Sequence, residues 1–189
     1  GACAAARRTV GAQRLTQQVD VRQGDGLSVL LPGEAESIVI AGMGGALIAA
    51  ILAGAQNILG DVGTLVLQPM NGGAKLRRWL YANGWNIVDE ALARAGGRLY
   101  EIIRAERGTA EMPDDALLHI GACLFEKRDP LLREHIEAKT AKLTRAAEGM
   151  NASTTARQSE EYRETVSLLT ALRTLLVLCR ASQPKPPRP

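Results

Sequence analysis

The stretch Ser37–Leu52, SIVIAGMGGALIAAIL, contains the signals that decide the fold. Its first residues, Ser37–Ile40, are apolar and rich in β-branched side chains, which predicts a buried strand. Glycines at positions 42, 44 and 45 interrupt this run, and the apolar sequence that follows predicts a helix to about Leu59. A strand, a glycine turn and a helix in this order are typical of a βαβ unit, so the stretch predicts an α/β fold with a parallel sheet.

Strand and helix signals continue on both sides of this stretch. Upstream, residues 1–18 are rich in alanine and predict short helices, and Val19–Arg22 alternates like a short strand. Downstream, Thr64–Leu67 predicts a strand, and Ala74–Ala82 predicts a helix that Gly84 stops. The segment 85–107 reads as two strands joined across Ala95-Gly96-Gly97, which predicts an antiparallel hairpin closing one edge of the sheet.

The last third of the chain has a helical pattern. No strand pattern is visible from Leu117 onward, and the segment 125–150 carries apolar residues near helical spacing. After the polar linker NASTTARQS, apolar residues recur every three or four positions from Tyr162 to Cys179. Two such helices with a short linker predict an antiparallel helical hairpin, and the proline-rich end of the chain predicts disorder.

Composition restricts the class of protein. The chain has 189 residues, a formal net charge of +3 and three cysteines without a CxxC motif. This charge is compatible with a nucleic-acid partner but does not demonstrate one. The cysteine pattern indicates reduced thiols and no zinc site, and no segment resembles a signal peptide or a membrane span, so we predict a cytoplasmic protein without metal. His119 and His135 are isolated and receive no role, and Trp79, Tyr81 and Trp85 are predicted to pack in the core.

The glycine turn does not fit the common nucleotide-binding motifs. A dinucleotide fingerprint needs a third glycine where the chain has Leu47, and an acid at the end of the next strand, whereas Asp61 precedes that strand. No Lys-Ser/Thr pair follows, so a Walker loop is excluded as well. These failures argue against an oxidoreductase. A tight turn with nothing bound remains the alternative interpretation.

Three predicted strands end in unusual residues, and these ends would lie along one rim. They are Gly24-Asp25-Gly26, Ala41–Gly45 and Gln68-Pro69-Met70. Ligands bind at the carboxyl ends of strands in a parallel sheet, and an acid such as Asp25 can accept a hydrogen bond from the amine of an adenine. An ordinary turn at Asp25 and a simple strand terminator at Pro69 remain open alternatives.

Several blocks of the sequence together resemble one family. VRQGDGLSVL, IVIAGMGGALI, LVLQPM, LRRWLYANGWNIVDEAL, YEII and FEKRDPLLREHIE occur in this order. They resemble bacterial tRNA (adenine(22)-N(1))-methyltransferases of the TrmK type, which methylate adenine N1 with S-adenosylmethionine. The resemblance implies a class I, Rossmann-like methyltransferase sheet followed by a coiled-coil-like helical hairpin. It divides the chain into a partial methyltransferase domain (1–112), a helical domain (113–182) and a disordered tail (183–189).

The resemblance also implies site residues. For the cofactor S-adenosylmethionine these are Asp25, Gly26, Ala41, Gly42, Met43 and Gly44. For the substrate they are Gly45, Gln68, Pro69, Arg77 and Arg78. Basic residues that could bind tRNA phosphates are Lys75, Arg77, Arg78, Arg133, Lys139, Lys142 and Arg145, although such charges are more often solvated faces.

One departure from the family shapes the functional hypothesis. The family's first strand with its cofactor loop, and the acid that ends its second strand, have no counterpart in this sequence. We therefore expect a family member without its amino-terminal third, inactive alone, whose catalytic acid would lie upstream of Gly1. The open sheet edge also predicts marginal stability. The alternative hypothesis is a non-catalytic tRNA-binding or helical interaction module, and the sequence predicts no oligomeric state.

Overall fold

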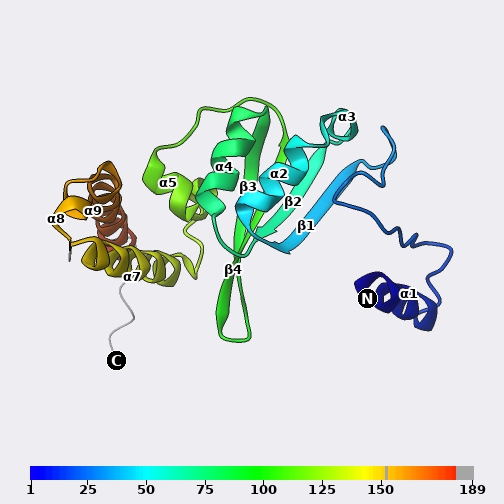
Figure 1. Ribbon diagram of the computed structural model, residues 1–189, viewed down its shortest axis with the longest axis horizontal. Helices are drawn as coiled ribbons and strands as arrows, with labels where there is room; N and C mark the ends of the chain where they lie inside the picture. Colours follow the sequence, from blue (N-terminus) through cyan, green and yellow to red (C-terminus); the bar gives the residue numbers. More distant parts are fainter. Residues whose placement is uncertain (152, 182–189) are drawn as a thin grey trace.

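The computed structural model describes residues 1–151 and 153–181 and shows an α/β sheet flanked by a group of helices (Figure 1). Four strands form one sheet in the order β1-β2-β4-β3. The strands are β1 (Ser37–Met43), β2 (Thr64–Pro69), β3 (Trp85–Ala95) and β4 (Arg98–Arg107). β1 and β2 are parallel, whereas β4 runs antiparallel to both of its neighbours. The predicted strand–helix alternation and the hairpin at one edge are confirmed.

Helices α2 (Gly45–Ala53) and α4 (Gly73–Ala82) cover one face of this sheet (Figure 1). Ile38 and Ile40 of β1 point toward them and are buried, whereas Val39 between them is 70% exposed on the opposite face. This alternation follows from the two-residue period of a strand. The buried side chains of the sheet, α2 and α4 form one apolar core that includes Leu52, Leu65, Leu80 and Trp85.

One predicted helix is too long, one predicted strand is absent, and β1 and β2 run two to three residues past their predicted ends at Ile40 and Leu67. The helix expected to reach Leu59 ends at Ala53, because the chain turns at Gly54 before the short helix α3 (Gln56–Leu59). The strand expected over Val19–Arg22 is absent, since no described strand lies beside it to bond its N–H and C=O groups. Arg22 instead binds the carboxylate of Glu34 and the carbonyl of Val29. Helix α1 (Ala2–Ala12) precedes this segment and has no buried residue.

The remaining helices form a second apolar core beside β3. They are α5 (Asp115–Ile120), α6 (Ala122–Glu126), α7 (Leu132–Asn151), α8 (Thr154–Arg157) and α9 (Glu160–Ala181). Leu92 of β3 packs with Leu124, Ile136 and Leu172 in this core. The tail predicted to be disordered, 183–189, lies outside the described residues. In the described part of the chain, no helix has the length and apolar character needed to cross a bilayer.

Candidate functional site

The carboxyl ends of β1 and β2 lie side by side and form the rim where the sequence predicted a site. Ala41 pairs with Gln68 and Met43 with Pro69, and the register shifts between Ala41 and Met43. Gly42 is the extra residue of this bulge and has φ +79°, a left-handed value that glycine adopts without strain. The backbone N–H of Gly42 donates to the Gln68 side-chain oxygen at 3.0 Å, so the bulge fixes the orientation of the Gln68 amide.

The loop after β1 is joined to the loop after β2 by backbone hydrogen bonds. The Gly45 N–H donates to the Asn71 carbonyl and the Met70 N–H donates to the Met43 carbonyl, each at 2.8 Å. A Cβ atom on Gly45 would lie 2.5 Å from the Gly72 carbonyl oxygen. Only glycine permits this approach, so Gly45 joins the two loops. Sequence reasoning missed Asn71 and Gly72, although the glycine pair at 72 and 73, shortly after a strand, was a signal of close backbone contact.

Asp25 lies on a separate hollow beside this rim. The hollow has a volume of about 720 Å³ and is lined by the segment from Asp25 to Ser28 and by apolar residues of α2, including Leu47 and Ile51. The Asp25 carboxylate has no hydrogen-bond or ion-pair partner within the described ranges. Leu47, 53% exposed, lines the hollow and sits in the first turn of α2, just past the glycine loop. A free acceptor beside apolar walls suits an adenine ring.

The residues predicted to bind the cofactor are therefore divided between two places. Asp25 and Gly26 line the hollow, whereas Ala41, Gly42, Met43 and Gly44 belong to the rim and do not line it. Gly26 has φ +53° and lies against Ile51 of α2, with 3.1 Å between the position of an added Cβ and Ile51 Cγ2. The two places are adjacent, because α2 begins directly after the glycine loop. Exposed Met43 and Met70 add apolar surface at the rim.

The prediction that Arg77 binds RNA phosphates is wrong for this structure. Its side chain is only 1% exposed and its Nε donates to Glu90 Oε1 at 2.6 Å. Its Nη1 donates to the Leu118 carbonyl at 3.1 Å, and its Nη2 lies 2.8 Å from Glu101 Oε2. The neighbouring Arg78 is more than half exposed beside Asp115, so it alone of this pair faces solvent.

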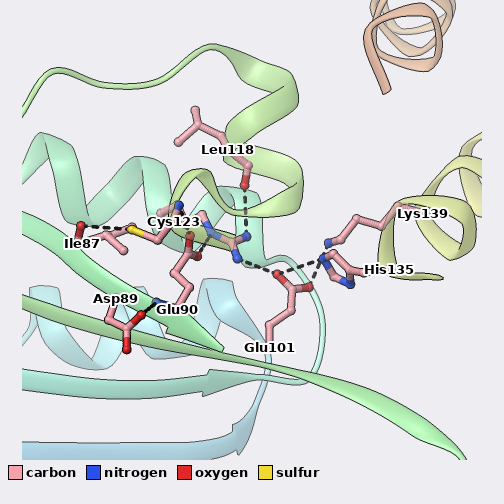
Figure 2. Close-up of polar contacts among 9 residues, drawn as sticks. Ile87, Asp89, Glu90, Glu101, Leu118, Cys123, His135 and Lys139 are labelled. Atoms are coloured by element: carbon pink, nitrogen blue, oxygen red, sulfur yellow. Dashed lines mark hydrogen bonds and ion pairs between the residues drawn. The ribbon is translucent and has the colours of Figure 1, made fainter. Parts of the chain in front are cut away.

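Arg77 belongs to a buried cluster of charged residues at the junction of the sheet with the helices (Figure 2). Lys139 of α7 binds the other oxygen of Glu101 at 2.9 Å, and His135 Nε2 lies 3.9 Å from Glu101 Oε2. Burial alone would raise the pKa of Glu101, but the nearby charges of Arg77 and Lys139 lower that pKa to about 2. Burial lowers the pKa of His135 to about 4, so its ring is neutral at physiological pH.

Two glycines make room for this cluster. A Cβ on Gly121 would lie 2.7 Å from Glu90 Oε2, and a Cβ on Gly73 would lie 2.8 Å from Glu101 Oε2. Glu90 Oε2 also accepts from the Cys123 N–H at 3.1 Å. The cluster thus connects α4, both strands of the hairpin, α6 and α7, which gives these residues a structural role instead of direct contact with a ligand.

The other basic residues predicted to bind phosphate differ in whether their charge is already paired. Lys75, Lys142 and Arg145 are exposed and have no ion-pair partner among residues 1–151 and 153–181. Arg133 pairs with Glu137 on the surface, and Lys139 is held by Glu101. In the described ranges, no group of three or more His, Cys, Asp or Glu side chains could hold a metal ion.

Comparison with known proteins identifies what the chain resembles. The model of the family described as tRNA (adenine(22)-N(1))-methyltransferase, TrmK, matches residues 1–171. The tRNA (adenine(22)-N(1))-methyltransferase of Bacillus subtilis is 41% identical over 112 residues, which are 59% of this chain and 47% of the relative. The match therefore spans about half the length of that curated relative.

Two solved structures share the fold. The crystal structure of the B. subtilis m1A22 tRNA methyltransferase TrmK matches with a TM-score of 0.78 at 30% identity. The match covers 95% of this chain and 77% of the B. subtilis chain. A Streptococcus pneumoniae structure in complex with S-adenosyl-L-methionine has the same TM-score and identity. That match covers 90% of this chain and 74% of the S. pneumoniae chain. These likenesses confirm the predicted Rossmann-like methyltransferase fold.

Proposed function

Because the chain belongs to the tRNA (adenine(22)-N(1))-methyltransferase family, we propose that its strand rim serves transfer of a methyl group from S-adenosylmethionine to adenine N1 of tRNA. The single observation that carries the proposal is the position of the free Asp25 carboxylate on a hollow that adjoins the glycine loop of β1. The hollow would hold the adenosine part of the cofactor, and the rim would receive the acceptor base.

The hollow offers the interactions that an adenosine group requires. Asp25 supplies a hydrogen-bond acceptor for the exocyclic amine, while Leu47 and Ile51 supply apolar contact for the ring. When bound, the cofactor supplies an electrophilic methyl group on a sulfonium. Adenine N1 bonds to that methyl carbon as the carbon–sulfur bond breaks, and the positive charge moves from sulfur to the adenine ring.

The chain's own residues would act by positioning. N1 lies on the Watson–Crick edge, so the base must leave its stack to reach the rim. Gln68, oriented by the Gly42 N–H, presents its amide beside the exposed Met43 and Met70. Carbonyl oxygens of the Ala41–Gly45 loop would accept a hydrogen bond from the adenine amine and offset the charge that develops on the ring. The residues proposed for phosphate contacts are the exposed Lys75, Arg78, Lys142 and Arg145, without the buried Arg77.

Calorimetric titration with S-adenosylmethionine, together with transfer of labelled methyl to a tRNA transcript, tests the proposal. Replacing Asp25 by Asn keeps the size of the side chain but removes its charge, and we expect the cofactor Kd to rise about tenfold or more. Asp61→Asn, at another turn, is the matched control and should leave that Kd unchanged. A transcript with guanine at position 22 should accept no methyl group.

Two results would contradict the proposal. Equal cofactor affinity of the wild-type and Asp25→Asn proteins would remove Asp25 from the site. Binding of tRNA without measurable heat from millimolar cofactor would favour the non-catalytic tRNA-binding module over the enzyme.

A further inference from the structure

The β3–β4 hairpin extends past the rim that carries the proposed site (Figure 1). Leu67 of β2 pairs with Ile103 of β4, and β2 ends two residues later at Pro69. The hairpin ladder continues through Ala93↔Tyr100, Arg94↔Leu99 and Ala95↔Arg98. At a rise of about 3.3 Å per residue, these three pairs carry the turn about 10 Å beyond the end of β2.

The tip of the hairpin, residues 93–100, is slender and basic. Its sequence ARAGGRLY contains two arginines, an aromatic residue and no acid. Gly96 and Gly97 have φ +53° and +73°, as the two central residues of a tight hairpin turn require. Because these two residues have no side chains, a bulky partner can approach their backbone closely.

The hairpin is fixed at its base instead of swinging freely. Glu101 and Glu90, just below the tip, are held in the buried cluster by Arg77, and Lys139 of α7 binds Glu101 as well (Figure 2). Closer to the turn, Arg94 forms an ion pair with Glu134 of α7. These contacts keep the tip at a set place beside the rim, which lowers the entropy lost when a partner binds.

The two arginines of the tip point to opposite faces of the ribbon. Arg94 shares a face with Leu92 and turns toward α7, whereas Arg98 lies on the other face and has no ion-pair partner in the described residues. Tyr100 is partly exposed and lies on the same face as Arg98, since two residues separate them along β4. A free guanidinium beside an aromatic ring suits phosphate contact and base stacking.

We propose that the tip of the β3–β4 hairpin is an RNA-binding element that contacts the tRNA next to the acceptor adenine, with Arg98 binding a phosphate and Tyr100 stacking on a base. The inference rests on the proposed function, because the rim must receive the adenine for the tip to lie beside it. Exposed Lys142 lies three residues after Lys139 on α7, so it continues the basic surface from the foot of the hairpin.

Arg98→Gln tests the proposal by fluorescence anisotropy with a tRNA transcript at several salt concentrations. Loss of one phosphate contact should reduce the slope of log K against log salt by about 0.7–0.9 and raise Kd about four- to sixfold near 0.15 M salt. Arg104→Gln is the matched control. Arg104 lies on the same strand and is half exposed, but it stands opposite Val66 of β2 in the strand register, below the rim. Arg98→Lys keeps the positive charge that a phosphate contact requires and should stay within about twofold of wild type.

Each outcome has a clear meaning. An unchanged Kd and salt slope for Arg98→Gln, with methyl transfer by the wild type intact, overturns the hairpin proposal alone. An equal loss for Arg104→Gln overturns it too, because the effect would then come from overall charge. Absence of tRNA binding by the wild-type chain overturns both the hairpin proposal and the proposed function. Equal melting temperatures of the variants verify that the loss is not due to unfolding.

Discussion

Gly45→Ala is the sharpest test of how the glycine turn is built. The added Cβ would lie 2.5 Å from the Gly72 carbonyl oxygen, 2.9 Å from its carbonyl carbon and 3.1 Å from the Asn71 carbonyl oxygen. All three atoms belong to the backbone, so no flexible side chain can move aside. To reach ordinary van der Waals contact the two loops must separate by about an ångström, which also stretches the 2.8 Å hydrogen bond from Gly45 to Asn71.

The magnitude follows from three contributions to the free energy of unfolding. Overpacking in a tight site costs about 1–3 kcal/mol. A weakened hydrogen bond costs about 1 kcal/mol more, while alanine at the start of a helix returns about 0.5–1 kcal/mol relative to glycine. The net destabilisation is about 1–3 kcal/mol, which corresponds to a melting temperature lower by about 3–10 °C for a chain of this length.

Urea and thermal unfolding followed by circular dichroism measure this effect. Gly54→Ala is the matched control, because its added Cβ would lie 3.5 Å from the Ala50 carbonyl oxygen, an ordinary contact, at φ −76°. We expect that control to be neutral or slightly stabilising. If Gly45→Ala unfolds at the same urea concentration as Gly54→Ala, the close approach of the two loops is wrong, and the glycine serves some other purpose.

Further predictions concern the buried cluster. Arg77→Met should destabilise the fold by about 3–5 kcal/mol because it leaves Glu90 buried without a counter-charge, whereas Arg78→Met on the surface should cost less than about 1 kcal/mol; urea midpoints compare them. The pKa of His135 is lowered from 6.5 to about 4, so the unfolded chain binds its proton first as pH falls. Stability should therefore decrease by up to about 3 kcal/mol between about pH 6.5 and 4, and His135→Gln should flatten this part of the pH profile; an unchanged slope would contradict the burial of a neutral ring.

Elements whose signals lie within a few residues of sequence were predicted correctly. The hairpin turn at Gly96–Gly97 was found because two adjacent glycines between alternating strands have few other uses. The helix Ala74–Ala82 was found, within one residue, from its apolar period and the glycine that follows it. By contrast, Val19–Arg22 has the pattern of a strand, but no strand lies beside it in the part of the chain that the structure describes. No local pattern reports whether such a partner is present.

The wrong prediction that Arg77 contacts phosphate has a similar cause, although the sequence of α4 did contain a signal of its burial. In α4, Gly73, Leu76, Arg77 and Leu80 are all buried, so Arg77 lies within the apolar stripe while Arg78 lies outside it. An arginine within such a stripe must meet acids from another element. Glu90 and Glu101 come from strands whose register is set only by pairing, so the sequence showed the donor but not its acceptors.

The position of these acids explains why the hairpin can project and still be ordered. Among the described residues, the sheet core and the helical core have no buried residue in common, and the charged cluster lies at their junction. A buried ion pair contributes little net stability compared with apolar packing, but a misaligned one leaves charges without partners and costs several kcal/mol. The junction therefore selects one orientation of α7 against the hairpin. Because Glu101 is the first residue of β4 below the tip, that selection also sets the position of Arg98 relative to the rim.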